Sequence, residues 1–503
     1  MIAHTAEIGN VPALVSLALA LADFVDQAVK DALPAHQFEL QLWKHMLALG
    51  YQTFAQFLAQ QGTGDLGPNV ALPDGSTAKR LPELHSRDYR TVFGKFVIPR
   101  TCYGSREGQK ITFVPLDNRL QLPESDYSYL LQEWNQTLGC EASFDNASAA
   151  LQKILDFKQP VDSLERINRQ MADAVEPFRN SRPLPEAKAE GALFVLSGDG
   201  KGVVIRREPG DPQPKAHRNK GDKANKKRMS IVGAIYSVDR YVRTPEEVVA
   251  ALFRDPRDPD KPKVGRPEPV GKHLWARLSQ AKDGSLGEPI DAVFGWQAAE
   301  LKRRDPDGIK EVVCLMDGQG ALWDGKERHF PERTVEILDL LHVAPRLWQA
   351  GHLFHKEGSV AVREFVRERL LRVLQGESKG VVSGLRRMGT LRGLSGDKKK
   401  KLRTLCNYLA SNESRMRYDE YLKKGYPVAS GVIEGACRHY VKDRMERSGM
   451  RWTKAGAQAM LDVRSEYLNG DWEAFGQFRI AHETERLYPH RGILDSVPQG
   501  NAA

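Results

Sequence analysis

The sequence is poor in cysteine, and its cysteines follow no metal-binding or disulfide pattern. The five cysteines among the 503 residues are Cys102, Cys140, Cys314, Cys406 and Cys437. An odd set without C-x-x-C spacing argues against a zinc ribbon or a disulfide scaffold and favours the reducing cytoplasm. His352 and His355 have a spacing that suits zinc, but neither the Glu of an H-E-x-x-H motif nor a nearby cysteine accompanies them.

Long apolar runs are also missing. No uninterrupted apolar stretch reaches the roughly 20 residues that a membrane span needs. The N-terminus has no basic lead before its apolar stretch, and Asp23 and Asp26 soon interrupt that stretch. We therefore expect neither a signal peptide nor a membrane partner. The hydrophobic fraction of 41% and the charged fraction of 28% are ordinary for a soluble protein.

Positive charge is concentrated rather than spread. Segment 201–230 has ten basic and three acidic residues, 379–403 has nine and one, and 438–454 has six and two. Because the net charge of the whole chain is only +9, the remainder of the chain is acidic overall. Clustered positive charge predicts a nucleic-acid partner.

Residues 1–125 are predicted to be mostly helical, with one small β-element. Apolar residues at helical spacing predict helices up to about residue 62. Thr91–Thr101 and Gln109–Val114 predict the two arms of a β-hairpin.

Residues 126–185 predict a helical region and a linker. Two helices separated by a Pro-containing turn fit a helix-turn-helix DNA reader, with Arg166, Asn168 and Arg169 on the second helix. Ordinary helix packing explains the pair equally well. A Pro-rich, charged stretch places a domain boundary near residue 185.

Residues 186–475 predict an α/β domain. Apolar runs bounded by turn residues predict strands at Leu193–Ser197, Val203–Arg206, Met229–Ser237, Glu311–Met316 and Val335–Leu340. Helices are expected at Pro245–Phe253, Leu274–Leu278 and Ala298–Arg303. The resulting order, β-β-β-α-β-α-β, is that of an RNase H-like fold, in which the first and fourth strands lie side by side.

A helical insertion is expected inside this domain. Residues 346–427 have a helical and basic sequence that is longer than a normal connection, which divides the core into 186–345 and 428–475. Within the insertion, Lys398–Lys401 is interpreted as the solvated start of a helix rather than as a specific contact. A polar, loosely ordered tail is expected over 476–503.

Three carboxylates stand where such a core could use them. Asp199 and Asp317 each follow an apolar run and precede a glycine, and Glu434 lies at the edge of the apolar face of a helix. Oxygen ligands of this kind suit two Mg²⁺ ions, with Mn²⁺ as a substitute, which together promote phosphoryl transfer. A single Asp-Gly after a strand is more often a turn, but two such motifs with a helical Glu in a basic context favour a site.

Five motifs surround these acids. They are Asp199–Val203, Leu315–Gly318, Ile337–Val343, Ser430–Arg438 and Asp443–Trp452. These motifs resemble bacterial insertion-sequence transposases of the ISKra family, which are DDE transposases related to Mutator-like elements. The resemblance covers about 190–475 and implies an RNase H-like core whose metal-binding triad is Asp199, Asp317 and Glu434. The stretch from Asp339 to His342 is similar to the C/D-x-x-H motif of that group, which implies a place for His342 near the active site. A buried core histidine is the alternative.

Basic and aromatic side chains near the acids are candidates for DNA contact. They are Lys220, Lys223, Lys226, Lys227, Arg228, Arg438, Arg444, Arg447, Arg451 and Trp452. Arg447 and Arg451 would hold a phosphate while Trp452 stacks on an unpaired base. Solvated loop charge is the alternative for the lysines, and core packing is the alternative for Trp452.

The sequence thus predicts a DDE transposase that binds terminal inverted repeats, cleaves phosphodiesters and joins the freed 3′-hydroxyls to target DNA. We expect it to act as at least a dimer on double-stranded DNA and, by the same resemblance, in the bacterial nucleoid. A non-catalytic DNA-binding regulator derived from a transposase, or a structure-specific nuclease on the same fold, is the alternative.

Overall fold

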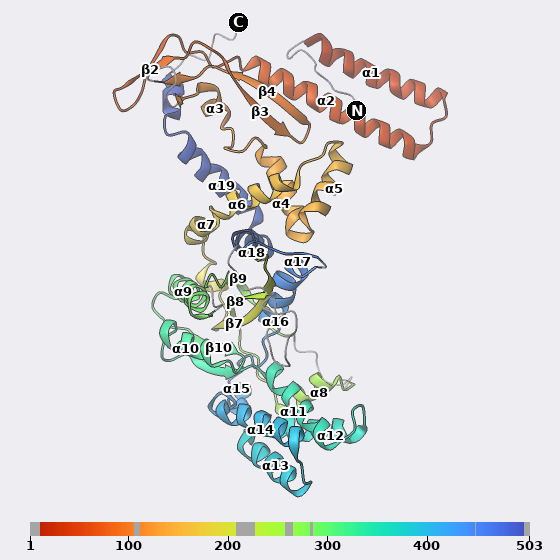
Figure 1. Cartoon of the computed structure of the whole chain (residues 1–503), viewed down its shortest axis with the longest axis vertical. Helices are drawn as coiled ribbons and strands as arrows, with labels where there is room; N and C mark the ends of the chain where they lie inside the picture. The colour runs from red at the N-terminus through yellow and green to blue at the C-terminus, as the bar shows by residue number, and fades with distance from the viewer. Residues whose placement is uncertain are drawn as a thin grey trace. The chain divides into compact units, whose positions relative to one another are not determined.

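The computed structural model describes residues 11–104, 111–207, 227–256, 265–281, 285–447 and 449–496 (Figure 1). The chain divides into two compact units, Met1–Phe178 with Trp472–Ala503, and Arg179–Asp471. Both units combine helices with β-sheets. Among the described residues, every helix is too short or too polar to cross a bilayer.

The first unit contains helices and two small antiparallel sheets. Its helices are α1 (Val11–Lys30), α2 (Ala35–Gln60), α3 (Pro115–Leu120), α4 (Tyr129–Glu141), α5 (Phe144–Leu155), α6 (Val161–Ala172), α7 (Val175–Ser181) and α19 (Trp472–Leu487). Its strands are β1 (Asn69–Ala71), β2 (Thr77–Arg80), β3 (His85–Thr91), β4 (Gly94–Arg100), β5 (Tyr103–Gly104) and β6 (Ile111–Phe113). The sheet orders are β1-β2-β5-β6 and β3-β4.

The predicted hairpin is only partly correct. Most of Thr91–Thr101 forms β4, but β4 pairs with β3 rather than with the second predicted arm. That second arm contains β6, which pairs with the short strand β5. The residues between β5 and β6 lie outside the described part of the chain.

The helical pair α5–α6 is present, but one of its three candidate DNA-contacting residues is enclosed. The Asn168 side chain is buried, and its Nδ2 donates a hydrogen bond to Gln136 Oε1 at 2.9 Å. Asn168 therefore supports helix packing, whereas Arg166 and Arg169 are exposed. A DNA-reading role for α6 stays a prediction that rests on those two arginines.

The prediction of a loosely ordered tail is wrong as far as Leu487. Helix α19 runs through this stretch, buries Phe475 completely, and buries the polar side chain of Arg479. The Arg479 guanidinium donates a hydrogen bond to Gln132 Oε1 at 2.9 Å, which fixes α19 against α4 in the first unit. The polar composition that suggested disorder instead belongs to a helix with a narrow buried face.

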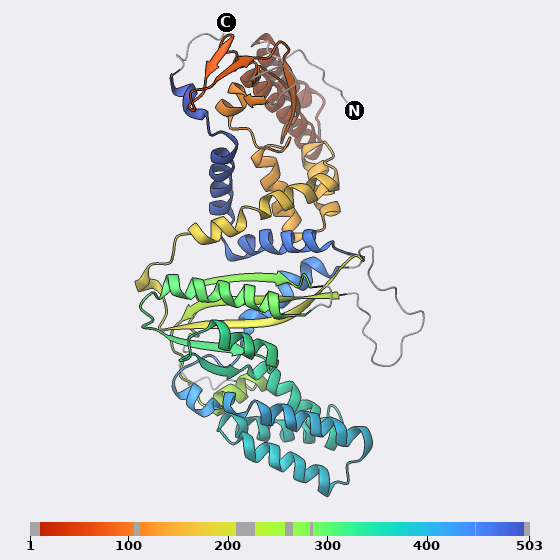
Figure 2. The same ribbon diagram turned by 60° about the vertical axis from the view of Figure 1, so that its left-hand side comes forward.

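The second unit is built on a five-stranded sheet in the order β11-β10-β7-β8-β9 (Figure 2). The strands are β7 (Leu193–Val204), β8 (Lys227–Val238), β9 (Val270–Leu278), β10 (Glu311–Met316) and β11 (Val335–Leu338). The first three strands are antiparallel neighbours, and β10 and β11 run parallel to β7. The predicted pairing of the strands that carry Asp199 and Asp317 is confirmed by the pairing of β7 with β10.

Two assignments in this domain were wrong: two predicted strands belong to one strand, and one predicted helix is a strand. Leu193–Ser197 and Val203–Arg206 are parts of one strand, β7, because β8 pairs with it continuously through the Gly-rich stretch. Leu274–Leu278 is not a helix but the end of β9, so the third strand is β9. Helix α8 (Pro245–Phe253), capped by Thr244, therefore precedes the third strand instead of following it.

Helices cover both faces of this sheet. On one face, α9 (Gly287–Arg304) and α10 (Gly320–His329) pack on side chains such as Phe194 and Leu196. On the other face, Leu193 and Val195 share a core with α8 and with the helices of the expected insertion. Those helices are α11 (Leu340–Phe354), α12 (Val360–Leu374), α13 (Ser378–Leu391), α14 (Gly396–Ser411) and α15 (Tyr418–Lys423).

The chain then returns to the sheet through four short or medium helical segments. They are α16 (Gly431–Ala436), the π-helical turn η3 (Cys437–Lys442), α17 (Asp443–Met445) and α18 (Lys454–Asn469). Side-chain amides of α18 cover the open edge of β9. Gln458 accepts from the Leu278 N–H at 2.8 Å and donates to the Ala276 carbonyl at 3.0 Å. Asn469 makes the same pair of bonds to Leu274. These amides make the hydrogen bonds to the β9 backbone that a neighbouring strand would otherwise make.

Removing one of these amides should loosen β9. In Gln458→Ala, an edge N–H and a carbonyl lose their partners, at a cost of about 1 to 3 kcal/mol. Hydrogen exchange of the β9 amides, followed by mass spectrometry, should then be roughly tenfold to a hundredfold faster. Thr404→Ala, at an exposed position of α14, is the control and should leave β9 exchange unchanged. Unchanged exchange in Gln458→Ala would show that α18 does not protect the edge.

Candidate active site

The register of two parallel strands places Asp199 beside Asp317. Leu193 lies opposite Glu311, and Leu196 lies opposite Cys314. The same register, continued along both chains, sets Asp199 opposite Asp317, the first residue after β10. Neighbouring strands lie about 4.8 Å apart, and residues in register on parallel strands point to the same face. The two carboxylates therefore emerge side by side on the face that the insertion helices cover.

Asp199 differs from its predicted setting, because it lies inside β7 and not after its end. The glycine before it serves the opposite face of the sheet. A Cβ at Gly198 would come within 2.7 Å of the Phe294 ring, and one at its cross-strand neighbour Gly233 within 2.4 Å of Val293. These two glycines let α9 approach the sheet closely.

Asp199 is half-buried and held by two donors. The Gly200 N–H donates to its Oδ1 at 2.6 Å, and the Cys437 thiol donates to its Oδ2 at 3.4 Å. Burial raises the pKa of Asp199 above its ordinary value, and the negative charge of Asp317 raises it further. The two hydrogen bonds and the nearby His342 oppose that shift.

Cys437 is a site residue that the sequence analysis missed. Its side chain is buried, and burial followed by the charge of Asp199 raises the pKa of its thiol. Glu434, one helical turn earlier, adds to the same shift and therefore also lies near this thiol. The i, i+3 spacing of Glu434 and Cys437 was a signal in the sequence, since it puts both on one side of a helix.

Asp317 is fixed by the start of α10 and by an insertion helix. Its Oδ1 accepts from the Gln319 N–H at 2.9 Å, and its carbonyl accepts from Trp323 Nε1 at 2.8 Å. The next residue, Gly318, donates its N–H to the Tyr408 hydroxyl of α14 at 3.2 Å. Any side chain at Gly318 would collide with the Tyr408 ring, because a Cβ there would lie 2.5 Å away.

His342 stands on the first turn of α11 with Asp339 as the helix cap. Asp339 accepts from the Leu341 N–H at 2.9 Å and from the Ser430 N–H at 3.3 Å. Burial raises the pKa of Asp339, and His342 opposes the shift. His342 is half-buried and opposes the rise in the pKa of both Asp199 and Asp339, and a catalytic role for it stays a prediction. Asp339 also ties the start of α11 to the residue that precedes α16.

Glu434 does not form a metal site with Asp199 and Asp317 in this structure. Its side chain is exposed. In the part of the chain that the structure describes, no three Asp, Glu, His or Cys side chains stand close enough together to hold a metal ion. Helix α16, which carries Glu434, passes into the π-helical turn η3 at Cys437. Single π-helical turns within helices are frequent at functional sites, where they re-aim side chains.

Of the predicted DNA-contacting lysines and arginines in 220–228, the structure describes only two. Lys220, Lys223 and Lys226 lie outside the described residues. Lys227 forms an ion pair with Glu446 at 2.7 Å, and the Arg228 guanidinium donates to the Ala281 carbonyl at 2.9 Å. Both are thus partly engaged within the protein.

In the 438–452 segment, the predicted DNA-contacting residues divide into exposed and buried side chains. Arg438, Arg447 and Arg451 are exposed and stay candidates for phosphate contact. Arg444 does not, because its side chain is fully buried and lies over the Trp452 ring at 4.9 Å. Trp452 is half-buried, and its backbone pairs with the end of β7, so packing is the role that the structure describes for it.

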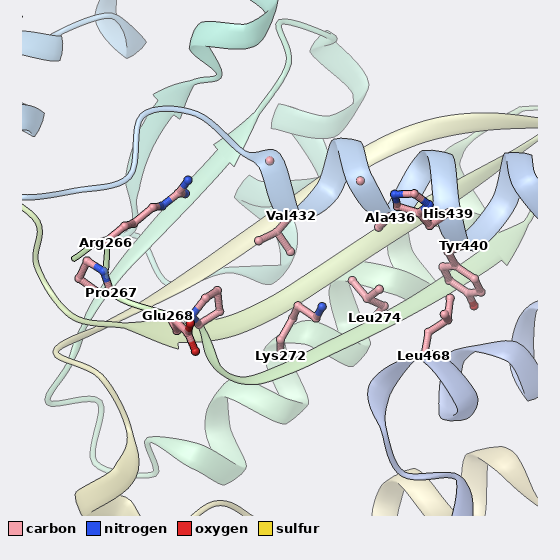
Figure 3. Close-up of a pocket in the computed structure, with 13 residues that line it drawn as sticks. Arg266, Pro267, Glu268, Lys272, Leu274, Val432, Ala436, His439, Tyr440 and Leu468 are labelled. Atoms are coloured by element: carbon pink, nitrogen blue, oxygen red, sulfur yellow. The ribbon is translucent and has the colours of Figure 1, made fainter. Parts of the chain in front are cut away.

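A cavity of about 640 Å³ lies beside α16 but apart from the acids (Figure 3). Its lining comes from the 266–269 loop, from Lys272 and Leu274 of β9, and from the side of α16 and η3 that carries Val432 and His439. Asp199, Asp317, Glu434 and Cys437 do not line it. The cavity and the acid pair are therefore separate features of the second unit.

No protein-family model matches the sequence, and no curated protein matches it. Among solved structures, the Drosophila P element transposase strand transfer complex is similar, with a TM-score of 0.25 and 10% sequence identity. The match covers 78% of this chain and 85% of that chain. Similarity this weak does not establish a common fold, so the resemblance of the sequence motifs to a transposase family stays a prediction.

The raised pKa of Asp199 has a consequence for stability. The native state keeps a proton on Asp199 to a higher pH than the unfolded chain does, so this group lowers the stability as pH rises through the interval between the two pKa values. Asp199→Asn removes that penalty. We expect the variant to melt at a higher temperature than the wild type at neutral pH, with a difference that shrinks toward about pH 4.

Differential scanning calorimetry across this pH range measures the effect. Asp324→Asn, which neutralises an exposed carboxylate on α10, is the control for loss of one negative charge. An Asp199→Asn variant that melts below the wild type at neutral pH would contradict the assignment of a half-buried carboxylate whose charged form is disfavoured.

Proposed function

We propose that the chain is a DNA-cleaving and DNA-joining enzyme of the DDE transposase type, with an RNase H-like core. The observation that carries this proposal is the parallel pairing of β7 with β10, whose register, continued along both chains, brings Asp199 beside Asp317, the first residue after β10. The strand order, with three antiparallel strands followed by two that run parallel to the first, supports the RNase H-like assignment. The concentration of basic residues around these acids supports DNA as the substrate.

The acid pair suits a hard divalent cation. Burial raises the pKa of Asp199, and the charge of Asp317 raises it further, so a bound cation would offset both effects on the Asp199 carboxylate. Asp199 and Asp317 would hold the ion, with Glu434 as the third ligand from α16. Bound there, Mg²⁺ or Mn²⁺ would activate the attacking oxygen and stabilise the leaving oxygen.

The remaining groups position the acids. Cys437 and Gly200 orient the Asp199 carboxylate through hydrogen bonds, and the Gln319 N–H orients Asp317. His342 places an ionisable ring beside Asp199, and Asp339 holds the helix that carries it. Exposed Arg438, Arg447 and Arg451 would bind the DNA backbone.

The reaction needs no covalent protein intermediate. In cleavage, a water oxygen bonds to phosphorus, the P–O3′ bond breaks, and the leaving 3′-oxygen takes up a proton. In joining, the freed 3′-hydroxyl attacks a phosphodiester of the target, whose own P–O3′ bond breaks. Two DNA ends must be brought together for this, so we expect at least a dimer on DNA.

Isosteric changes at the acid pair test this function. In Asp199→Asn and Asp317→Asn, divalent-ion-dependent cleavage of a plasmid carrying the DNA that flanks the reading frame should fall at least about a hundredfold. Binding of the same DNA, measured by fluorescence anisotropy, should stay within about twofold, because neither side chain is one of the cations that would contact the phosphates.

Asp324→Asn is the matched control, since it removes one exposed carboxylate from the neighbouring helix α10. Cleavage by Asp199→Asn or by Asp317→Asn at the rate of the wild type would refute the enzyme assignment. DNA binding by the wild type without any cleavage would favour the non-catalytic regulator instead.

A further inference from the structure

The helical hairpin α13–α14 carries a dense positive surface. Between Lys379 and Arg403 the chain has nine basic residues and one acidic residue. All nine of these cations are exposed. We name part of this exposed set the basic hairpin surface, and its members are Arg387, Arg392, Lys398–Lys401 and Arg403.

These cations are not used to hold the protein together. Among the described residues, the members of the basic hairpin surface form no ion pair, in contrast to nearby Lys379, which pairs with Glu413 at 3.1 Å. Lys398–Lys401 stands in the first two turns of α14, where like charges repel each other and the helix dipole disfavours cations. A feature that opposes helix stability in this way indicates a role outside the fold.

Helix α14 connects this surface rigidly to the acid pair. Its apolar side chains Leu402, Leu405 and Leu409 are buried in the core shared with the sheet. At its other end, the Tyr408 hydroxyl accepts from the N–H next to Asp317. Since a helix rises 1.5 Å per residue, Lys398 lies roughly 15 Å along the axis from Tyr408, a length of roughly four base pairs of duplex DNA.

We propose that the basic hairpin surface binds the phosphate backbone of the DNA duplex that flanks the bond to be cleaved. This inference rests on the proposed function and adds a second DNA contact to the arginines of the 438–452 segment. It replaces the interpretation of Lys398–Lys401 as a merely solvated helix start. The reason is that the run is part of a larger exposed cationic surface on a helix that reaches the acids.

A nucleic-acid backbone fits this surface better than an anionic membrane does. Helices that lie on membranes bury an apolar face beneath their cations. The apolar face of α14 is already buried in the protein core. Among the described residues of the hairpin, Leu391 at the end of α13 is the one large apolar side chain that is exposed, which is too little to insert into a membrane. A row of phosphates needs only the charge that the surface presents.

The test compares the salt dependence of DNA binding in matched variants of the full chain. The probe is a fluorescein-labelled duplex of random sequence, titrated at several salt concentrations without divalent ions. In the variant Lys398→Gln, Lys399→Gln, Lys400→Gln and Lys401→Gln, the slope of log K against log salt should become shallower by about three to four. The affinity at low salt should fall by at least about tenfold.

Two controls separate the surface from general charge and from folding. Lys302→Gln, Lys356→Gln, Lys423→Gln and Lys424→Gln remove the same charge from exposed lysines elsewhere in the second unit and should leave the slope near that of the wild type. The variant Lys398→Arg, Lys399→Arg, Lys400→Arg and Lys401→Arg should keep the wild-type slope, because it keeps the charge. A slope in the four-Gln variant equal to that of its control would overturn the proposal.

The outcomes also distinguish this inference from the enzyme assignment. Plasmid cleavage that depends on Asp199, together with an unchanged salt slope in the four-Gln variant, would refute the surface alone. A changed slope in a protein that never cleaves DNA would refute the enzyme assignment and keep the surface. Binding of phosphatidylserine vesicles, but not of duplex, through these lysines would overturn the proposal in favour of a membrane.

Discussion

The parallel pairing of β7 with β10 is the constraint on which the site depends. Its register, continued three residues past the last paired residues, sets Asp199 beside Asp317, although the two acids are far apart in the sequence. A slip of one residue would turn one of the two carboxylates to the opposite face, toward α9. β10 holds this register by packing into a different core on each face, with Val313 on the side of the insertion helices and Val312 on the side of α9 and α10.

The helices arrange themselves around this pair in two groups. One group, α9 and α10, packs on the face away from the acids and needs the glycines Gly198 and Gly233 for its close approach. The other group brings side chains to the acids from distant segments, namely Cys437 from η3, Tyr408 from α14 and His342 from α11. The result is a half-buried Asp199 carboxylate whose charged form is disfavoured by its burial.

The sequence predicted the elements whose signals are local. Glu311–Met316 is a strand because a pure apolar run is bounded by turn residues, and Pro245–Phe253 is a helix because Thr244 and Glu247 form a capping box. The prediction failed where tertiary pairing overrides local preference. Three glycines near Asp199 suggest a turn, but β8 pairs along the whole stretch and keeps it a strand.

The candidate site shows the same division. Asp199 and Asp317 could be proposed as site residues because each follows an apolar run. Leu274–Leu278 was assigned wrongly because the hydrogen bonds that hold it as an edge strand come from side chains of α18, far along the chain. Cys437 gave no signal alone, since its importance comes from a contact with a residue more than two hundred positions away. The burial of Arg444 beneath Trp452 likewise depends on how the chain returns to β7.

The most direct test of the account is whether Asp199 and Asp317 bind one divalent ion together. Electron paramagnetic resonance of Mn²⁺ titrated into the full-length protein counts bound ions without requiring a DNA substrate. The account predicts that the wild type and Asp324→Asn bind Mn²⁺, and that Asp199→Asn and Asp317→Asn each lose that binding to the same extent as the double variant. Equal Mn²⁺ binding by the wild type and both single variants would contradict it.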